Sequence, residues 1–259
     1  MLGSHRAVLF DFFGTLSQAC HRGTAHQEVA RVLGCRLEEL TAVLDTSFYP
    51  RSRGEYGDAI ATLRWIAGEL GLRPDAATLR AAHRARIAAL RADLRLRPQA
   101  YPVLRRLRRA GYKLAVVSDC GWELPEILPA LRIAPLLHAS VFSVHIGSCK
   151  PDPAMYLAAC AALRVEPRQC LYIGDGGSRE LTGASALGMG AIRLAAPDLA
   201  EHLVFRSDES FCGPVAVSLS DIATGLLPAA ASKSAAAMAY AAGWTAAPSR
   251  AGDRRAVGV

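Results

Sequence analysis

The segment Ala7-Val-Leu-Phe-Asp-Phe-Phe-Gly-Thr15 is the clearest indication of the fold in this sequence. Its first four residues are apolar, and a polar residue, Asp11, and a glycine, Gly14, follow at once, which is typical of a strand that ends in a turn. A short continuous apolar run indicates a strand that is buried on both faces of a parallel sheet. We therefore expect residues 7–10 to form a buried strand with Asp11 at its carboxyl end.

The chain after this stretch alternates strand patterns with helical patterns. Apolar runs predict further strands over 113–118, 140–144, 170–174, 190–194 and 214–219. Amphipathic patterns predict helices between them over 101–110, 154–163 and 178–187. Such alternation predicts a doubly wound α/β domain, a Rossmann-like parallel sheet with helices on both faces. Ligands of such sheets bind outside the carboxyl ends of the strands.

A long segment without strand patterns separates the first two strands. It carries helical patterns over 25–33, 37–44, 58–70 and 75–94. A crossover between parallel strands needs only about a dozen residues. We therefore predict a catalytic core over 1–17 and 97–227 and an inserted helical cap over 18–96. The remaining tail, 228–259, is rich in small residues and has little to bury, so we expect it to be disordered.

The composition excludes several classes of protein. Hydrophobic residues make up 51% of the chain and charged residues 20%, as in ordinary globular proteins. No segment approaches the roughly 18 apolar residues of a membrane span, and the first residues show no signal-peptide pattern. The seven cysteines are scattered and never spaced as Cys-x-x-Cys, which argues against a disulfide framework or a zinc site. We expect a cytoplasmic protein that does not contact a membrane.

The net charge of +7 comes almost entirely from arginine. The densest run of arginines lies over 105–109, within a predicted helix. No aromatic residues interleave with it to stack on bases, so a solvated helix face is the better interpretation than a nucleic-acid site. We expect no nucleic-acid partner; the sequence gives no indication of the oligomeric state.

Four polar clusters follow predicted strands, where the sheet would bring them together. They are Asp11-Phe-Phe-Gly-Thr15, Ser118-Asp119, Lys150-Pro-Asp-Pro153 and Gly174-Asp-Gly-Gly-Ser-Arg-Glu180. One carboxylate can attack as a nucleophile, and a second can share a hard cation with it. A lysine can hold the charge between carboxylates, and a hydroxyl can bind the oxygens of a transferred group.

In these motifs the chain resembles the haloacid dehalogenase superfamily of hydrolases, in the family's order over residues 6–220. The resemblance implies that Asp11 attacks the substrate to form an aspartyl intermediate, which water then hydrolyses. It implies that Ser118 binds phosphoryl oxygens and that Lys150 stabilises Asp11 and the transferred group. The segment over 18–96 matches the family's cap, which selects the substrate.

The same resemblance implies a Mg²⁺ site. Its ligands would be Asp11, the backbone carbonyl of Phe13, and Asp175. Glu180 would be a further ligand or would hold a water, with an ordinary residue in the first turn of a helix as the alternative interpretation.

Phe13 departs from the pattern of most phosphatases of the superfamily, which carry a second aspartate there as general acid/base. Phenylalanine cannot protonate a leaving group, and this loss removes an effect of roughly 10²–10⁴-fold. The aromatic residue resembles the dehalogenase version of the motif. In contrast, Asp175 and Glu180 resemble the version found in metal-binding phosphatases.

The candidates for substrate contacts are Thr15, Asp119 and Arg51. Asp119 can equally be a loop aspartate. Arg51 and Arg53 could receive a carboxylate or phosphate, but a solvated loop is the favoured interpretation for them.

Three functions are consistent with the sequence. The first is a Mg²⁺-dependent phosphohydrolase of a small, anionic phosphorylated metabolite, because converging carboxylates without a cation would repel one another. The second is a metal-free 2-haloacid dehalogenase, which Phe13 favours and Asp175 and Glu180 oppose. The third is a non-catalytic ligand-binding or regulatory protein that kept the fold. The sequence does not identify the substrate.

Overall fold

A six-stranded parallel sheet forms the centre of the fold in the computed structural model, which describes residues 5–202 and 207–227. The strand order is β3-β2-β1-β4-β5-β6. The strands are β1 (Ala7–Phe10), β2 (Lys113–Ser118), β3 (Ala139–Phe142), β4 (Cys170–Gly174), β5 (Gly190–Leu194) and β6 (Val215–Ala216). Phe10 of β1 is in register with Val116 of β2 and Ile173 of β4, so the polar residues after these three strands gather at one edge.

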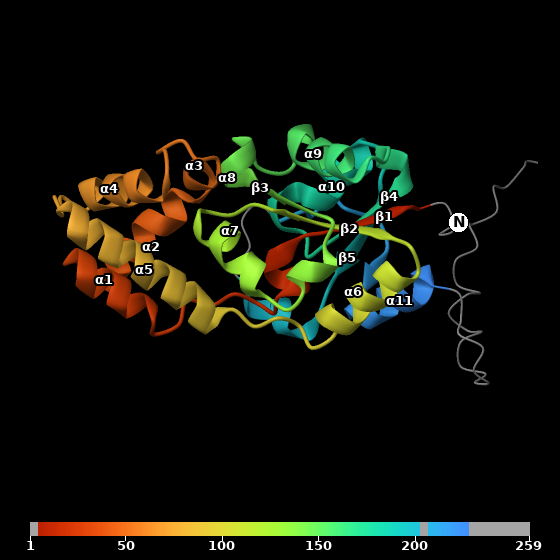
Figure 1. Cartoon of the computed structure of the whole chain (residues 1–259), viewed down its shortest axis with the longest axis horizontal. Coiled ribbons are helices and arrows are strands. Elements are labelled where there is room, and N and C mark those ends of the chain that lie inside the picture. Colours follow the sequence, from red (N-terminus) through yellow and green to blue (C-terminus); the bar gives the residue numbers. More distant parts are fainter. Residues whose placement is uncertain (1–4, 203–206, 228–259) are drawn as a thin grey trace, which may run out of the picture. The chain divides into compact units, whose positions relative to one another are not determined.

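Helices cover both faces of the sheet, as Figure 1 shows. They are α6 (Ala100–Arg109), α7 (Glu123–Ile127), α8 (Ser143–Ile146), α9 (Pro153–Leu163), α10 (Glu180–Ala186) and α11 (Leu219–Leu226). Side chains of β1 alternate between the faces, as strand geometry requires. Val8 and Phe10 pack in a cluster with α6 and α11, whereas Ala7 and Leu9 pack in a second cluster with α9 and α10. The predicted α/β class with a parallel sheet is confirmed.

The helices of the predicted cap have an apolar core of their own. They are α1 (His26–Leu33), α2 (Leu37–Thr46), α3 (Phe48–Ser52), α4 (Ala59–Glu69) and α5 (Ala76–Asp93). Val29, Leu40, Leu63, Ile66 and Leu79 belong to one buried cluster that contains no residue of the sheet. The cap boundaries at 18 and 96 stay a prediction.

Two strand predictions were too long. The predicted strand over 140–144 ends at Phe142, because Ser143 begins the short helix α8 and its hydroxyl bonds to the backbone of Cys120. The strand predicted over 214–219 is only Val215–Ala216, because the Ser218 side chain caps the start of α11.

Helix α3 lies between the helical patterns predicted over 37–44 and 58–70, where the sequence analysis predicted no helix. Pro50 is in the first turn of this helix, where its missing N–H would have no helical partner anyway. All seven cysteines are free thiols. Among residues 5–202 and 207–227, every helix is too short or too polar to cross a bilayer. The tail predicted to be disordered, 228–259, lies outside the described residues.

Candidate active site

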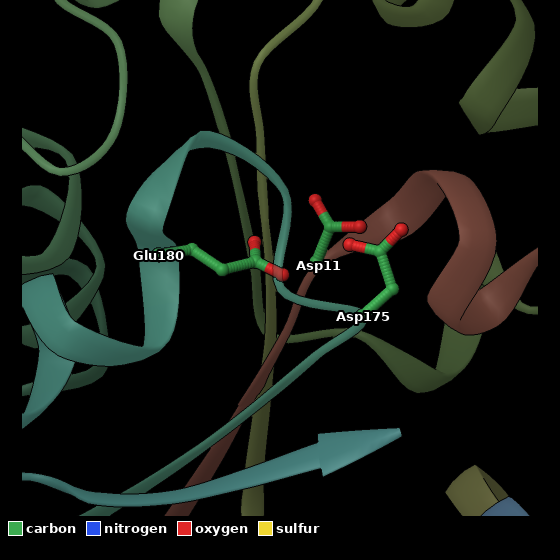
Figure 2. Close-up of side chains that lie close together, drawn as sticks. All are labelled: Asp11, Asp175 and Glu180. Atoms are coloured by element: carbon green, nitrogen blue, oxygen red, sulfur yellow. The ribbon is translucent and has the colours of Figure 1, made fainter. Parts of the chain in front are cut away.

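The polar residues that follow β1 and β4 meet at the carboxyl edge of the sheet. Figure 2 shows the carboxylates of Asp11, Asp175 and Glu180 close together. One oxygen from each lies within 4.8 Å of the others. Asp11 follows β1, Asp175 follows the neighbouring β4, and Glu180 is the first residue of α10. The sheet therefore assembles three acids that are far apart in sequence.

Asp11 is almost fully buried, with 6% of its surface exposed. Its backbone N–H donates to the carbonyl of Ile173 at 2.9 Å, which fixes the end of β1 against β4. Burial raises the pKa of Asp11 to about 6, and the charge of Asp175 adds to this, although Lys150 acts in the opposite direction. In the absence of further positive charge, Asp11 is therefore a more basic carboxylate than an ordinary aspartate.

Lys150 lies at the centre of a buried hydrogen-bond network. Its ammonium group donates to Asp11 Oδ1 at 2.6 Å, to Glu180 Oε2 at 2.5 Å and to the Tyr172 hydroxyl at 3.2 Å. Burial alone would lower the pKa of Lys150, but Asp11 and Glu180 outweigh it and raise the pKa well above the ordinary value. The lysine therefore stays charged, and its three N–H donors are all used within the protein.

Glu180 contacts protein groups with both of its oxygens. Oε1 accepts the N–H of Gly176 at 3.1 Å, while Oε2 accepts from Lys150 and from the Tyr172 hydroxyl. Gly174 makes this approach possible, because a Cβ at that position would lie 2.0 Å from Glu180 Oε1. Glu180 is thus positioned to orient Lys150, a contact that the sequence did not indicate. Tyr172 was also missed; the signal was a tyrosine within a buried strand, whose hydroxyl needs a partner.

Asp175 is held by a histidine that no sequence motif indicated. Cys20 donates its N–H to His202 Nδ1 at 2.9 Å, and the other ring nitrogen, Nε2, lies 3.2 Å from Asp175 Oδ2. Burial acts to raise the pKa of Asp175, but the hydrogen bonds from His202 and the Gly177 amide outweigh it and lower the pKa. Asp175 is therefore ionised. Gly14, at φ +75°, leaves room for this pair, since a Cβ there would lie 2.6 Å from Asp175 Oδ2.

The acidic cluster fits a hard divalent cation at Asp11 and Asp175. Both offer carboxylate oxygens, the ligands that Mg²⁺ prefers. Three carboxylates face a single lysine here. Burial, together with the charges of the neighbouring acids, raises the pKa of both Asp11 and Glu180, and a cation at the cluster would favour their ionised forms. Glu180 fits this role less well than the sequence analysis expected, because Lys150, Tyr172 and Gly176 already use its oxygens.

Two predicted substrate ligands are buried hydroxyls. Thr15 and Ser118 have no exposed surface, and neither side-chain oxygen has a hydrogen-bond partner within the part of the chain that the structure describes. A buried unsatisfied hydroxyl costs about 1–3 kcal/mol. Neither residue is among those that line the cavity beside Asp11, so the structure does not bring these two hydroxyls into it. Asp119 has a different position, because its Oδ1 accepts the backbone N–H of Lys150 at 3.0 Å and so fixes the loop that carries the lysine.

A cavity of about 220 Å³ lies between this cluster and the cap helices. Asp11, Lys150 and Asp175 line one side of it, and Phe13 lines it as well, packed edge to face against Phe12. Arg51 of α3, within the predicted cap, also lines the cavity. The volume of the cavity suits a small molecule.

The interpretation of Arg51 as part of a solvated loop was wrong. Its residue surface is only 7% exposed, and it lies in helix α3. Its side chain donates to the Ser47 hydroxyl at 2.9 Å and the Leu44 carbonyl at 2.7 Å. Arg53, in contrast, is half-buried, pairs with Glu55 at 2.6 Å and does not line the cavity.

Comparison with known proteins identifies relatives of two kinds. A family model described as haloacid dehalogenase-like hydrolase matches residues 5–188. A glyceraldehyde 3-phosphate phosphatase of Methanopyrus kandleri is 36% identical over 98 residues, which cover 38% of this chain and 42% of that protein. A phosphoglycolate phosphatase of Nitrosospira multiformis is 31% identical over 180 residues, which cover 66% of this chain and 74% of that protein. The chain thus spans less than half of the first of these relatives.

A solved structure of an L-2-haloacid dehalogenase shares the fold. It superimposes with a TM-score of 0.60 at 26% sequence identity, over 86% of this chain and 98% of the other. Phosphatases and dehalogenases therefore both resemble this chain.

Proposed function

The chain belongs to the haloacid dehalogenase-like hydrolases, and we propose that it is a Mg²⁺-dependent phosphohydrolase of a small phosphate ester, with Asp11 as nucleophile. The observation that carries this proposal is the cluster of Asp11, Asp175 and Glu180, with carboxylate oxygens within 4.8 Å of one another. Lys150 balances only one of these charges. A divalent cation would balance the others.

Asp11, Asp175 and the backbone carbonyl of Phe13 would hold the ion. When bound, Mg²⁺ neutralises phosphoryl oxygens and orients the ester for in-line attack. Glu180 acts through Lys150, whose ammonium group it fixes against Asp11.

Asp11 Oδ attacks the phosphorus atom, and the bond from phosphorus to the leaving oxygen breaks. The alcohol departs as an alkoxide and takes up a proton. Water then attacks the phosphorus of the aspartyl-phosphate, which releases inorganic phosphate and restores the Asp11 carboxylate. The hydroxyls of Thr15 and Ser118, which have no partner among the described residues, would donate to phosphoryl oxygens when the substrate is bound. In neither step does Phe13 supply or accept a proton, so the first step is slow for substrates with poor leaving groups and the second is slow for every substrate.

A metal-free 2-haloacid dehalogenase is the second candidate, and two contacts favour it. Lys150 already bonds to Asp11 and Glu180, and His202 already bonds to Asp175, so each acid has a neutralising or donating partner without an ion. In this reaction Asp11 would displace halide from carbon to form an ester, which water would hydrolyse. Phe13 is compatible with this chemistry, because a halide leaves without protonation.

Four assays on the purified protein separate the two functions: phosphate release and halide release, each with Mg²⁺ and with EDTA. The proposal predicts phosphate release from an activated ester such as p-nitrophenyl phosphate, lost in EDTA. Halide release from a 2-haloacid that continues in EDTA, with no phosphate release, would establish the dehalogenase instead.

A further inference from the structure

Three charged residues that line the cavity form a buried group, which we call the arginine cluster: Arg51 and Arg86 of the cap helices and Glu123 of α7, a helix that covers the sheet. They come from α3, α5 and α7, and all three line the cavity that Asp11 lines. The side chains of Arg86 and Glu123 are only 11% and 15% exposed. Charges so well buried need partners, because removal from water costs several kcal/mol per ion.

The arginine cluster carries one positive charge in excess. Arg86 Nε donates to Glu123 Oε1, and these two charges cancel. Burial acts to raise the pKa of Glu123, but Arg86 and Arg51 outweigh it and lower the pKa to about 2, so the glutamate is ionised. Arg51 has only neutral hydrogen-bond partners, Ser47 and Leu44. Burial lowers the pKa of Arg51 to about 10, which still leaves it charged at neutral pH.

Donors of the arginine cluster remain without acceptors. Arg86 Nη1 is buried and has no hydrogen-bond partner among the described residues. Arg51 uses Nε and Nη2, and no acceptor among residues 5–202 and 207–227 bonds to its Nη1. Guanidinium groups with free N–H donors are suited to carboxylates and phosphates, which they bind through charge-assisted hydrogen bonds.

Other charges near the arginine cluster are already paired. Arg22 bonds to Asp45, and His26 lies 3.1 Å from Asp93. The same cavity is also lined by the apolar side chains of Phe48, Leu90, Leu94 and Leu124. An anionic group with a short apolar connection to the reacting ester would match this arrangement.

We propose that the arginine cluster binds a carboxylate at the end of the substrate remote from Asp11, so that the substrate is the phosphate ester of a small hydroxy acid. A carboxylate matches the single excess charge, whereas a second phosphate would leave up to one negative charge unbalanced in a largely buried site. This substrate class rests on the proposed phosphohydrolase function.

The test compares two esters that differ only at the remote end: the phosphate ester of glycolic acid and that of glycolamide. The wild-type protein with Mg²⁺ should hydrolyse the carboxylate ester with a kcat/KM about 10- to 100-fold above that of the amide ester, as expected for hydrogen bonds to a charged group. Arg51→Gln should abolish this preference by lowering kcat/KM for the carboxylate ester alone. Arg51→Lys, which keeps the charge, should restore part of it.

Arg53→Gln is the matched control, because Arg53 is two residues away, pairs with Glu55 and does not line the cavity. It should keep the full preference. If Arg51→Gln does not fold by circular dichroism, the double variant Arg86→Gln with Glu123→Gln removes Arg86 Nη1 as a charged donor without leaving Glu123 unpaired. It should reduce the preference several-fold.

Equal rates for the two esters in the wild type, or an equal loss for both in Arg51→Gln, would overturn the inference. If neither these esters nor p-nitrophenyl phosphate is hydrolysed, the phosphohydrolase function is refuted, and calorimetry with the same two esters tests the arginine cluster. If p-nitrophenyl phosphate alone is hydrolysed, the inference is overturned and the phosphohydrolase function stands. Tighter binding of the carboxylate ester that Arg51→Gln abolishes would then support the arginine cluster as a carboxylate site, and equal binding would refute it.

Discussion

The two sides of the cavity differ in charge and in how they are assembled. The catalytic side has three acids and one lysine. Asp11 and Asp175 follow strands, Glu180 opens α10, and Lys150 lies in the loop after α8. The other side has the arginine cluster, whose members come from two cap helices and from α7. The register of the strands determines which acids meet on the catalytic side. The packing of helices determines which residues form the arginine cluster. The residues of the reaction can therefore be recognised from short sequence motifs, whereas the residues of the arginine cluster can be recognised only from the tertiary structure.

Replacement of the nucleophile should abolish the hydrolytic activity. Asp11→Asn is expected to lower kcat by about 10⁴-fold or more, because an amide cannot attack and loss of a nucleophile gives effects of this order. Phosphate release with circular dichroism as a check on folding measures it. Asp152→Asn is the matched control, since Asp152 only caps α9, where asparagine serves equally well. Residual activity of Asp11→Asn above about a tenth of wild type would refute the nucleophile assignment.

We expect Phe13→Asp to supply the general acid/base that Phe13 cannot provide. Phe13 lines the cavity beside Asp11, so a carboxylate there can reach the leaving group. We expect hydrolysis of alkyl phosphates to rise by up to about 10²–10⁴-fold, with a smaller gain for p-nitrophenyl phosphate, whose leaving group needs no proton. Phe13→Asn controls for size and polarity. A gain of equal size in Phe13→Asn would show that proton transfer is not the cause.

His202→Ala should weaken Mg²⁺ binding by about tenfold to a hundredfold, as loss of a group that orients a metal ligand commonly does. The reason is the contact of His202 Nε2 with Asp175 Oδ2 at 3.2 Å. Calorimetry with MgCl₂ measures the change. His21→Ala, which alters the same cavity, should bind the ion like wild type. Tighter binding by His202→Ala would indicate that the histidine competes with the ion for Asp175.

The smallest expected effect is that of pH on Mg²⁺ binding. The pKa of Asp11 is raised to about 6 in the metal-free protein, chiefly by burial, and the ion binds the carboxylate form. Protons therefore compete with the ion below pH 6, and the affinity at pH 5 should be about tenfold lower than at pH 7. Binding at pH 5 should also release a proton, which titration in buffers of different ionisation enthalpy detects. An affinity that does not change between pH 5 and 7 would contradict the assignment of Asp11 as a ligand.

Much of the fold and of the catalytic side could be predicted from the sequence. The apolar runs of β1, β2, β4 and β5 are long enough to be recognised, and a residue that directly follows a parallel strand has a defined place at the edge of the sheet. The convergence of Asp11 and Asp175 follows from this rule, whereas Lys150 comes after the short helix α8. The ends of β3 and β6 were missed, because hydrogen bonds from Ser143 and Ser218 decide them and leave no mark in the apolar pattern.

The rest of the site depends on contacts between distant segments. His202 is 182 residues from Cys20, whose N–H fixes its ring, and no local pattern predicts such a pair. In the sequence, Arg86 is one of several arginines in the predicted helix over 75–94, and only the structure shows its contact with Glu123. The role of Glu180 was also incompletely predicted, because its bond to Lys150 requires both side chains to be buried together.

Rapid-quench mass spectrometry tests the central claim, that Asp11 forms an aspartyl-phosphate, most directly. Excess protein is mixed with an alkyl phosphate and Mg²⁺, quenched in acid at millisecond to second intervals and digested. We predict a phosphorylated peptide that carries the group on Asp11 and persists because Phe13 cannot activate the attacking water. Phosphate release without any phosphorylated Asp11 at any time, or turnover of a 2-haloacid in EDTA with no phosphate chemistry, would contradict the account.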